Sequence, residues 1–389
     1  MPGTADAGAT VERLLDEVRA EVGLDDFGAP SFRVGLEQLV HSVLESSDLN
    51  GIGQAALEAQ VKGHLANRLQ IVDWHATHPE VAGEEVTAPI VITGLPRTGT
   101  TALSHLLACD PANRSLLGWE AHQSVPPPRS DTFDTDPRFE AARAAGGTMD
   151  LLNPGFKAIH YDPPDKPIEC VVLFAQQFQS AIYSIEFTVP AYDEWMLAAD
   201  AGDLYAYHRS ALQVLQSQCP GRWQLKTPQH GLALDALYAT YPDARVVITH
   251  RDPVKCVASV LSLSNSLSGT FTDADHRDTI ASHWPGLMAE FANRPVEFRA
   301  RRPDAVIHDM PYEDLVADPV AAVRAMYATF GEELTDEAAG AMEAQAKESP
   351  QGAYGRHEYR LADFGLTRAD VEPLFEPYLE RHDVPREDA

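Results

Sequence analysis

Cations are scarce in this chain, and their scarcity limits what the protein can bind. The 389 residues contain 30 lysines and arginines against 58 aspartates and glutamates, so the formal net charge is −28. We therefore expect no nucleic acid partner and no docking on an anionic membrane surface, since both require an extended basic face. Any anionic ligand must instead be held by a local group of cations.

Cysteine pairs, long apolar runs and a leader-like start are also lacking. The four cysteines are widely spaced without a C-x-x-C pair, so neither a zinc site nor a disulfide framework is expected. No apolar run reaches the length that spans a bilayer, so we expect a protein without transmembrane segments. Residues 1–21 lack the basic and apolar regions of a secretory signal, and we expect a cytoplasmic protein.

The hydrophobic pattern predicts an α/β protein in three parts. Residues 1–88 are expected to form a helical N-terminal region, because apolar residues such as Leu36 and Leu39 recur at helical spacing. Residues 89–330 alternate strand-like and helix-like segments, which is typical of a P-loop-like parallel sheet flanked by helices. Residues 331–389 are expected to form a helical C-terminal segment.

The elements of the central part follow from β-branched runs and from apolar periodicity. Strands are predicted at 90–93, 116–119, 222–226, 244–251 and 305–308. Helices are predicted at 102–108, 168–180, 203–217 and 318–330, with further starts near Gly231 and at Pro253.

The loop after the first predicted strand contains the most informative pattern of the chain. Gly94 and Gly99 bracket this loop, and a helix-forming segment follows it. The backbone N–H groups of such a loop and the dipole of the following helix attract an anion. The spacing fits the phosphate loop G-x-x-x-x-G-K-[ST], except that Thr100 occupies the lysine position and the nearest cation is Arg97.

The missing lysine argues against an enzyme that uses ATP or GTP. A nucleoside triphosphatase places that lysine on the β- and γ-phosphates and a strand-borne aspartate on magnesium. The lysine is absent, and no convincing aspartate of this kind is found. A P-loop kinase or nucleotide hydrolase is therefore the alternative, and we expect the loop to hold a phosphate-like group other than the end of ATP.

Charged side chains follow several predicted strand ends. They are Arg97, Glu120, Lys226, His230 and Arg251. Because ligands of open parallel sheets bind beyond the carboxyl ends of the strands, we expect these side chains to converge.

Two short sequences, in order and far apart, carry a resemblance to a known family. The first is PRTGTT, from Pro96 to Thr101, and the second is THRDP, from Thr249 to Pro253, with Ser259 following. With them the chain resembles the sulfotransferases. GLPRTGTT, WE, LKTP-x-H and THRDP are together similar to the actinobacterial type III enzymes, including mycobacterial ones. The resemblance runs from residue 90 to 318 and more weakly to 366.

The resemblance implies a sulfuryl donor, 3′-phosphoadenosine 5′-phosphosulfate, and no metal. The 5′-phosphosulfate would be bound by loop residues, namely Arg97, Thr98, Gly99, Thr100 and Thr101. Arg251 and Ser259 would hold the 3′-phosphate, and Lys226 would stabilise the bridging oxygen of the leaving group. The basic segment 352–357 lies where the family often places a loop that closes on the 3′-phosphate, with Arg356 as its ligand.

The base that accepts the proton of the acceptor hydroxyl stays open among three residues. Glu120 resembles the catalytic glutamate of heparan sulfate sulfotransferases, which lies at a similar distance beyond the loop. His230 resembles the histidine that follows a lysine in cytosolic sulfotransferases, and a histidine has the more suitable resting pKa. Glu169 precedes a cysteine, and this acidic–cysteine motif is similar to one in the type III enzymes. We expect them in the order Glu120, His230, Glu169.

The acceptor is expected to be a small molecule, a lipid or a carbohydrate. Four aromatic residues either line an apolar acceptor pocket or belong to the core, namely Phe174, Phe178, Tyr183 and Trp195. The sequence leaves the oligomeric state open, with a homodimer among the options. A non-catalytic nucleotide-binding protein is a further alternative, which the presence of three potential bases disfavours.

Overall fold

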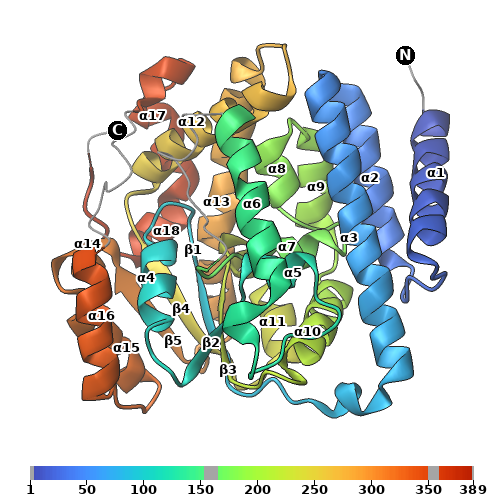
Figure 1. Cartoon of the computed structure of the whole chain (residues 1–389). Coiled ribbons are helices and arrows are strands. Elements are labelled where there is room, and N and C mark those ends of the chain that lie inside the picture. Colours follow the sequence, from blue (N-terminus) through green and yellow to red (C-terminus); the bar gives the residue numbers. More distant parts are fainter. Residues whose placement is uncertain (1–3, 153–164, 349–358, 388–389) are drawn as a thin grey trace.

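A parallel sheet of five strands forms the centre of the protein (Figure 1). The structure is a computed structural model that describes residues 4–152, 165–348 and 359–387. The strand order is β2-β3-β1-β4-β5, and every neighbouring pair is parallel. The strands are β1 (Ile90–Gly94), β2 (Asn113–Ser115), β3 (Arg222–Lys226), β4 (Arg245–His250) and β5 (Ile307–Pro311).

Helices surround this sheet. Three precede it, α1 (Thr4–Val22), α2 (Ser31–Ser46) and α3 (Gly51–Thr77). Between β1 and β5 lie α4 (Thr100–Leu107), α5 (Gly118–His122), α6 (Pro137–Leu152), α7 (Val171–Ala175), α8 (Ile182–Glu186), α9 (Pro190–Ala198), α10 (Gly202–Gln216), α11 (Leu234–Thr240), α12 (Pro253–Phe271) and α13 (Arg277–Arg301). After β5 follow α14 (Tyr312–Ala317), α15 (Pro319–Thr329), α16 (Asp336–Glu348), α17 (Arg368–Val371) and α18 (Glu376–Arg381).

Alternating strand residues separate the hydrophobic clusters on the two faces of the sheet. Val91 and Val246 pack with residues of α10 and α11. Ile90, Ile92 and Val247 pack on the opposite face with residues of α4, α15 and α16. Strands buried on both faces are hydrophobic at successive positions, as β1 and β4 are. The predicted α/β fold with a parallel sheet between helices is therefore confirmed.

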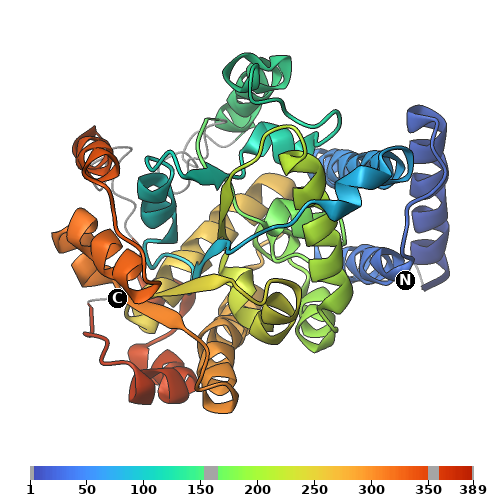
Figure 2. The same cartoon turned by 90° about the horizontal axis from the view of Figure 1, so that it is seen from below.

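The N-terminal helices pack on the helical layer beside the sheet. Their apolar residues, including Leu36 and Leu65, form a cluster with Phe178 and Phe271. A Cβ atom on Gly53 would lie 2.2 Å from the carbonyl oxygen of Phe271, so glycine lets α3 approach the end of α12 closely. Figures 1 and 2 show these blue helices on the side of the molecule opposite the orange and red helices α14–α16.

The C-terminal helices divide between two places. Residues of α16 join α4 and α15 on one face of the sheet. Val371, Phe375 and Tyr378 pack instead with apolar residues of α12 and α13. The segment beyond residue 330 is helical in its described part, while the domain boundaries at residues 88 and 330 stay predictions. No helix in the described ranges is both long and apolar enough to cross a membrane.

The strand predicted at 116–119 is wrong. Strand β2 ends at Ser115, and α5 begins at Gly118. The helix forms because Glu120 Oε1 accepts the backbone N–H of Leu117 at 3.1 Å, which caps the first helical turn. Glu120 therefore lies inside a helix rather than after a strand.

The long helix predicted at 168–180 is also wrong, because only Val171–Ala175 forms α7. The chain turns at Phe178, whose φ is +54°. The hydroxyl of Tyr192 donates to the Phe178 carbonyl at 2.9 Å and accepts the Ser180 N–H at 2.8 Å, so a distant side chain stabilises the turn.

Smaller differences concern element boundaries. Strand β5 begins at Ile307, two residues later than predicted, because its register pairs Ile307 with Val246 of β4. A 3₁₀ helix, Pro228–Ala233, precedes α11 where a helix start near Gly231 was predicted. The predictions at 203–217 and 318–330 match α10 and α15 to within one residue at each end.

Candidate functional site

The loop after β1 has backbone conformations that side chains tolerate poorly. Gly94 has a φ of +133°, Gly99 a φ of +93°, and Arg97 between them a φ of +74°. A Cβ atom on Gly94 would lie 2.5 Å from the carbonyl oxygen of Thr249, so only glycine allows β1 and β4 to approach here. Left-handed conformations of other residues cluster at functional sites, and Arg97 fits that pattern.

The three threonines of the loop take different places. Thr98 is fully buried, and its hydroxyl donates to the Leu95 carbonyl at 2.6 Å and contacts the hydroxyl of Thr249. Thr100 is buried as the first residue of α4, directly after Gly99. The Thr101 hydroxyl accepts a hydrogen bond from Lys226 at 3.0 Å. Thr98 therefore braces the loop, whereas Thr101 connects the start of α4 to β3.

Arg97, Arg251 and Ser259 come together at the carboxyl ends of β1 and β4. Arg97 Nε donates to Ser259 Oγ at 3.2 Å, and Arg251 Nη1 donates to the Arg97 carbonyl at 3.0 Å. Arg251 directly follows β4, and Ser259 lies within α12, which Asp252 caps by accepting the Val254 N–H. The arrangement places two guanidinium groups and a buried hydroxyl beside a helix N-terminus, which suits the binding of anionic groups.

Arg251 contacts a carboxylate along one edge and an aromatic ring on one face. Its Nε and Nη2 atoms donate to the two carboxylate oxygens of Glu387, each at 2.7 Å. The guanidinium carbon lies 4.1 Å from the ring centre of Tyr312 at the start of α14. Burial disfavours the charged form, but the hydrogen bonds to Glu387 and the neighbouring negative charges together exceed this effect and raise the pKa of Arg251. The edge suited to a phosphate therefore already binds an anion.

Lys226, at the end of β3, contacts both the start of α4 and Glu169. Lys226 Nζ donates to Thr101 Oγ1 at 3.0 Å and lies 3.2 Å from Glu169 Oε1. The Lys226 side chain is 1% exposed, whereas that of Glu169 is 21% exposed. The backbone N–H of Cys170 donates to the Lys226 carbonyl at 2.8 Å and thereby holds Glu169 beside the strand end.

Glu120 is fully buried and has a structural environment. Its Oε2 accepts a hydrogen bond from Arg114 Nη2 at 2.7 Å, and its Oε1 accepts one from the backbone N–H of Leu117 at the start of α5. Burial raises the pKa of Glu120, against the opposing charge of Arg114. Arg114 is itself 3.8 Å from the ring centre of Trp223. Both oxygens of Glu120 are thus engaged by groups that belong to the core.

His230 also points into the core. Its Nδ1 lies 2.8 Å from the hydroxyl of Tyr205, and its ring packs against those of Phe174 and His208. Its Nε2 is buried and has no hydrogen-bond partner among the described residues. Burial lowers the pKa of His230 well below its ordinary value. Of the three potential bases, the structure brings only Glu169 into contact with Lys226.

Two residues at this site were not predicted from the sequence. Tyr312 follows the last strand, which is where ligand contacts gather in parallel sheets, so its position offered a weak signal. Glu387 contacts Arg251 from 136 positions along the chain, and no sequence pattern marks it. Arg356 lies outside the described residues.

One group of side chains in the described ranges has the spacing of a metal site. His250, Asp309 and His382 each place one potential ligand atom within 4.8 Å of the others. His250 Nε2 already lies 2.8 Å from Asp309 Oδ1, and Arg299 Nη1 donates to Asp309 Oδ2 at 2.7 Å. Burial by itself would raise the pKa of Asp309. The hydrogen bonds and charges of His250 and Arg299 together exceed this effect and lower the pKa. The Asp309 carboxylate is thus satisfied by protein groups.

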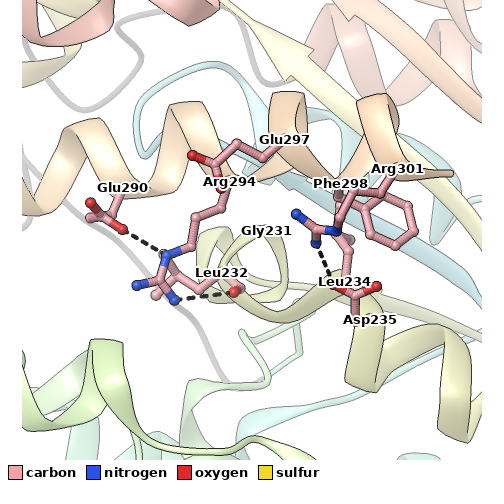
Figure 3. A pocket seen from close by; sticks show the side chains of 9 residues that line it. All are labelled: Gly231, Leu232, Leu234, Asp235, Glu290, Arg294, Glu297, Phe298 and Arg301. Carbon is pink, nitrogen blue, oxygen red and sulfur yellow. Dashed lines mark hydrogen bonds and ion pairs between the residues drawn. The ribbon is translucent and has the colours of Figure 1, made fainter. Parts of the chain in front are cut away.

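A polar hollow lies elsewhere, between α13 and the segment around α11 (Figure 3). Its charges are largely paired, since Arg294 contacts Glu290 at 2.7 Å and Arg301 contacts Asp235 at 2.6 Å. None of its nine lining residues belongs to the loop after β1 or to the arginine–serine group, which consists of Arg97, Arg251 and Ser259.

The aromatic residues considered for an acceptor pocket are core residues. Phe174, Phe178 and Tyr183 are fully buried within hydrophobic clusters, and Trp195 packs partly buried against one of them. Of the two interpretations offered by the sequence, the core is therefore the one that the structure supports.

Similarity to solved structures covers nearly the whole chain. Sulfotransferase STF9 from Mycobacterium avium superimposes with a TM-score of 0.89 and 30% identity, over 97% of this chain and 98% of that one. Sulfotransferase STF1 from Mycobacterium tuberculosis superimposes with a TM-score of 0.83 and 33% identity, over 94% of this chain and 97% of that one.

Curated relatives match over a shorter length. The omega-hydroxy-beta-dihydromenaquinone-9 sulfotransferases Stf3 of Mycobacterium bovis and Mycobacterium tuberculosis are 25% identical over 258 residues. The match spans 62% of this chain and 62% of the length of each relative. A family model described as the sulfotransferase family matches residues 89–336, which contain the loop and the arginine–serine group. The chain belongs to the sulfotransferase family.

Proposed function

We propose that this chain transfers a sulfuryl group from 3′-phosphoadenosine 5′-phosphosulfate to a hydroxyl group of an acceptor. The observation that carries the proposal is the convergence of Arg97, Arg251 and Ser259 beside the N-terminus of α4. This donor has two separate anionic groups, and it needs two neighbouring anion sites. Thr100 in place of the P-loop lysine supports a donor other than ATP.

The shape of the loop also suits a phosphosulfate. Gly94 and Gly99 adopt positive φ angles, and a loop of this kind before a helix N-terminus can bind an anion through its backbone N–H groups. Arg251 already holds the Glu387 carboxylate with two hydrogen bonds, and two phosphate oxygens present a similar pair of acceptors. We assign the loop to the 5′-phosphosulfate, and Arg251 with Ser259 to the 3′-phosphate.

The proposed reaction is an in-line displacement at sulfur. The acceptor oxygen forms a bond to sulfur while the bond from sulfur to the bridging phosphate oxygen breaks, and 3′-phosphoadenosine 5′-phosphate leaves. Arg97 would bind sulfate oxygens, and Lys226 would stabilise the negative charge that develops on the bridging oxygen. Lys226 is almost fully buried, so its charge acts with little screening by water. We expect no metal requirement, because these cations supply the charge.

We propose Glu169 as the base that takes the proton of the acceptor hydroxyl. Its side chain is 21% exposed, whereas Glu120 and His230 are fully buried. It lies 3.2 Å from Lys226, so an acceptor that reaches it is also near the transferred group. Burial raises the pKa of Glu120 and lowers that of His230, and each is engaged by core residues. The geometry thus favours the residue that the sequence ranks last.

The acceptor is proposed to be a small molecule, a lipid or a carbohydrate with a free hydroxyl. The name of the Stf3 relatives specifies a dihydromenaquinone with an omega-hydroxyl group. This name supports an isoprenoid alcohol as the first acceptor to test.

The test is a transfer assay with two matched acceptors, an isoprenoid quinone with a terminal hydroxyl and the same quinone without it. We expect a sulfated product by mass spectrometry only from the hydroxylated acceptor, with equal yield in the presence of a chelator. Lys226→Met should slow formation of the product by about 10²–10³ while it retains binding of the bisphosphate. A phosphorylated product formed from ATP and magnesium would refute the proposal.

A further inference from the structure

The segment that follows α18 ends on the arginine that we assign to the 3′-phosphate. Residues 382–387 leave α18 and bring the Glu387 carboxylate onto Nε and Nη2 of Arg251. Nη1 of the same guanidinium is bonded to the Arg97 carbonyl, and one face lies against Tyr312. The edge that Glu387 occupies is therefore the edge that a phosphate would use.

The main chain of Glu387 is anchored as well as its side chain. Its N–H donates a hydrogen bond to Asp252 Oδ2 at 2.7 Å, and its carbonyl accepts a hydrogen bond from Arg368 Nη2 at 2.6 Å. Arg368 also pairs with Asp252 at 2.7 Å, and Asp252 is buried at the start of α12. Several mutually supporting bonds thus position the carboxylate, unlike an isolated surface ion pair.

A second contact holds the beginning of the segment. The ring of His382 stacks on that of His250, with the ring centres 4.0 Å apart. The segment therefore contacts His250, Arg251 and Asp252, three consecutive residues at the end of β4. These are the central residues of the THRDP sequence that suggested a 3′-phosphate site.

We propose that Glu387 is an internal competitor for the 3′-phosphate of the donor. This inference rests on the proposed function of Arg251. The carboxylate occupies Arg251 when no donor is bound, and it leaves when the 3′-phosphate binds, because one guanidinium edge cannot hold both anions. The tether keeps the carboxylate at high local concentration. The apparent affinity for the donor is therefore the intrinsic affinity multiplied by the fraction of molecules in which Glu387 has left Arg251.

The competition is measurable by calorimetry with two nucleotides. Glu387→Gln should bind 3′-phosphoadenosine 5′-phosphate about tenfold more tightly than the native chain, because a neutral amide competes less well for Arg251. Binding of adenosine 5′-phosphate, which lacks the 3′-phosphate, should stay unchanged. Asp383→Asn is the matched control, since Asp383 is an exposed residue of the same segment and loses the same charge. It should leave both affinities unchanged.

A second measurement needs no variant. Release of Glu387 should expose the preceding bond, after Arg386, to trypsin, and the cleaved product is identified by intact mass. The bisphosphate should accelerate this cleavage, and adenosine 5′-phosphate should not.

The outcomes separate this inference from the proposed function. Equal or weaker binding of the bisphosphate by Glu387→Gln, or no change in cleavage when it binds, overturns the competition and leaves the donor assignment standing. Failure of both the native chain and Glu387→Gln to bind the bisphosphate refutes the donor assignment, and with it the competition.

Discussion

Replacement of Glu120 by alanine is expected to weaken the fold and to leave donor binding intact. Glu120 and Arg114 are paired at 2.7 Å, with side chains that are 0% and 6% exposed. The substitution would leave a buried guanidinium without its carboxylate, and within the described part of the chain Nε and Nη1 of Arg114 already lack hydrogen-bond partners. It would also remove the acceptor of the Leu117 N–H. Removing one partner of a buried ion pair costs about 3–5 kcal/mol of unfolding free energy.

The size of the chain converts this cost into a shift of melting temperature. With an unfolding entropy of about 2.1 cal/mol/K per residue, a chain of this length that unfolds as one unit has roughly 0.8 kcal/mol/K in total. A loss of about 4 kcal/mol therefore corresponds to a decrease of about 5 °C. The assay is differential scanning calorimetry, combined with titration of 3′-phosphoadenosine 5′-phosphate well below the melting temperature.

Glu140→Ala is the matched control for this prediction. Glu140 also pairs with an arginine, Arg143, at 2.7 Å, but the two side chains are 62% and 67% exposed. An exposed pair contributes at most about 1 kcal/mol, so the melting temperature should fall by no more than about 1 °C. If Glu120→Ala is as stable as the native chain and binds the bisphosphate but transfers no sulfuryl group, Glu120 is the base and our assignment to Glu169 is wrong.

Three further substitutions test the donor site and the buried histidines. Arg251→Gln should weaken binding of 3′-phosphoadenosine 5′-phosphate at least about tenfold, since a hydrogen bond to a charged group contributes about 1.5–3 kcal/mol; an equal loss for adenosine 5′-phosphate would place Arg251 outside the 3′-phosphate site. Lys226→Met should lower the single-turnover transfer rate by about 10²–10³, and a loss of affinity without a loss of rate would contradict its role. Burial lowers the pKa of His208 to about 3, so the unfolded chain binds a proton below about pH 6.5 that the folded chain excludes, and stability falls as the pH decreases. Chemical denaturation between roughly pH 6 and pH 4 should show that His208→Gln reduces this slope by about 1.4 kcal/mol per pH unit, and an unchanged slope would refute the argument.

The central sheet was predictable because its main strands carry a local signal. Strands β1 and β4 are short β-branched runs bounded by glycine or proline, and covered strands need such runs. Strand β2 has only three residues and its pairing comes from β3, so its own sequence carries little information. The course of residues 176–180 depends on the hydroxyl of Tyr192, which belongs to a later helix.

The loop was predictable for a different reason, because its backbone requires particular residues. Gly94 and Gly99 adopt conformations that other residues avoid, so their spacing is visible in the sequence. The environments of Glu120 and His230 were not predictable, since burial decides both and no local pattern reveals it. The partners of Glu120 are nearby residues, Arg114 and Leu117, whereas the hydroxyl beside His230 comes from Tyr205 on a preceding helix. The partner of Arg251 was likewise hidden, because Glu387 has no local feature that distinguishes it from other acidic residues.

The most direct test of the central claim is calorimetric binding of 3′-phosphoadenosine 5′-phosphate to the native chain, compared with ATP plus magnesium. We expect tight binding of the bisphosphate that a chelator leaves unchanged, with weak binding of ATP because Thr100 replaces the P-loop lysine. Tighter binding of ATP that depends on magnesium would contradict the account.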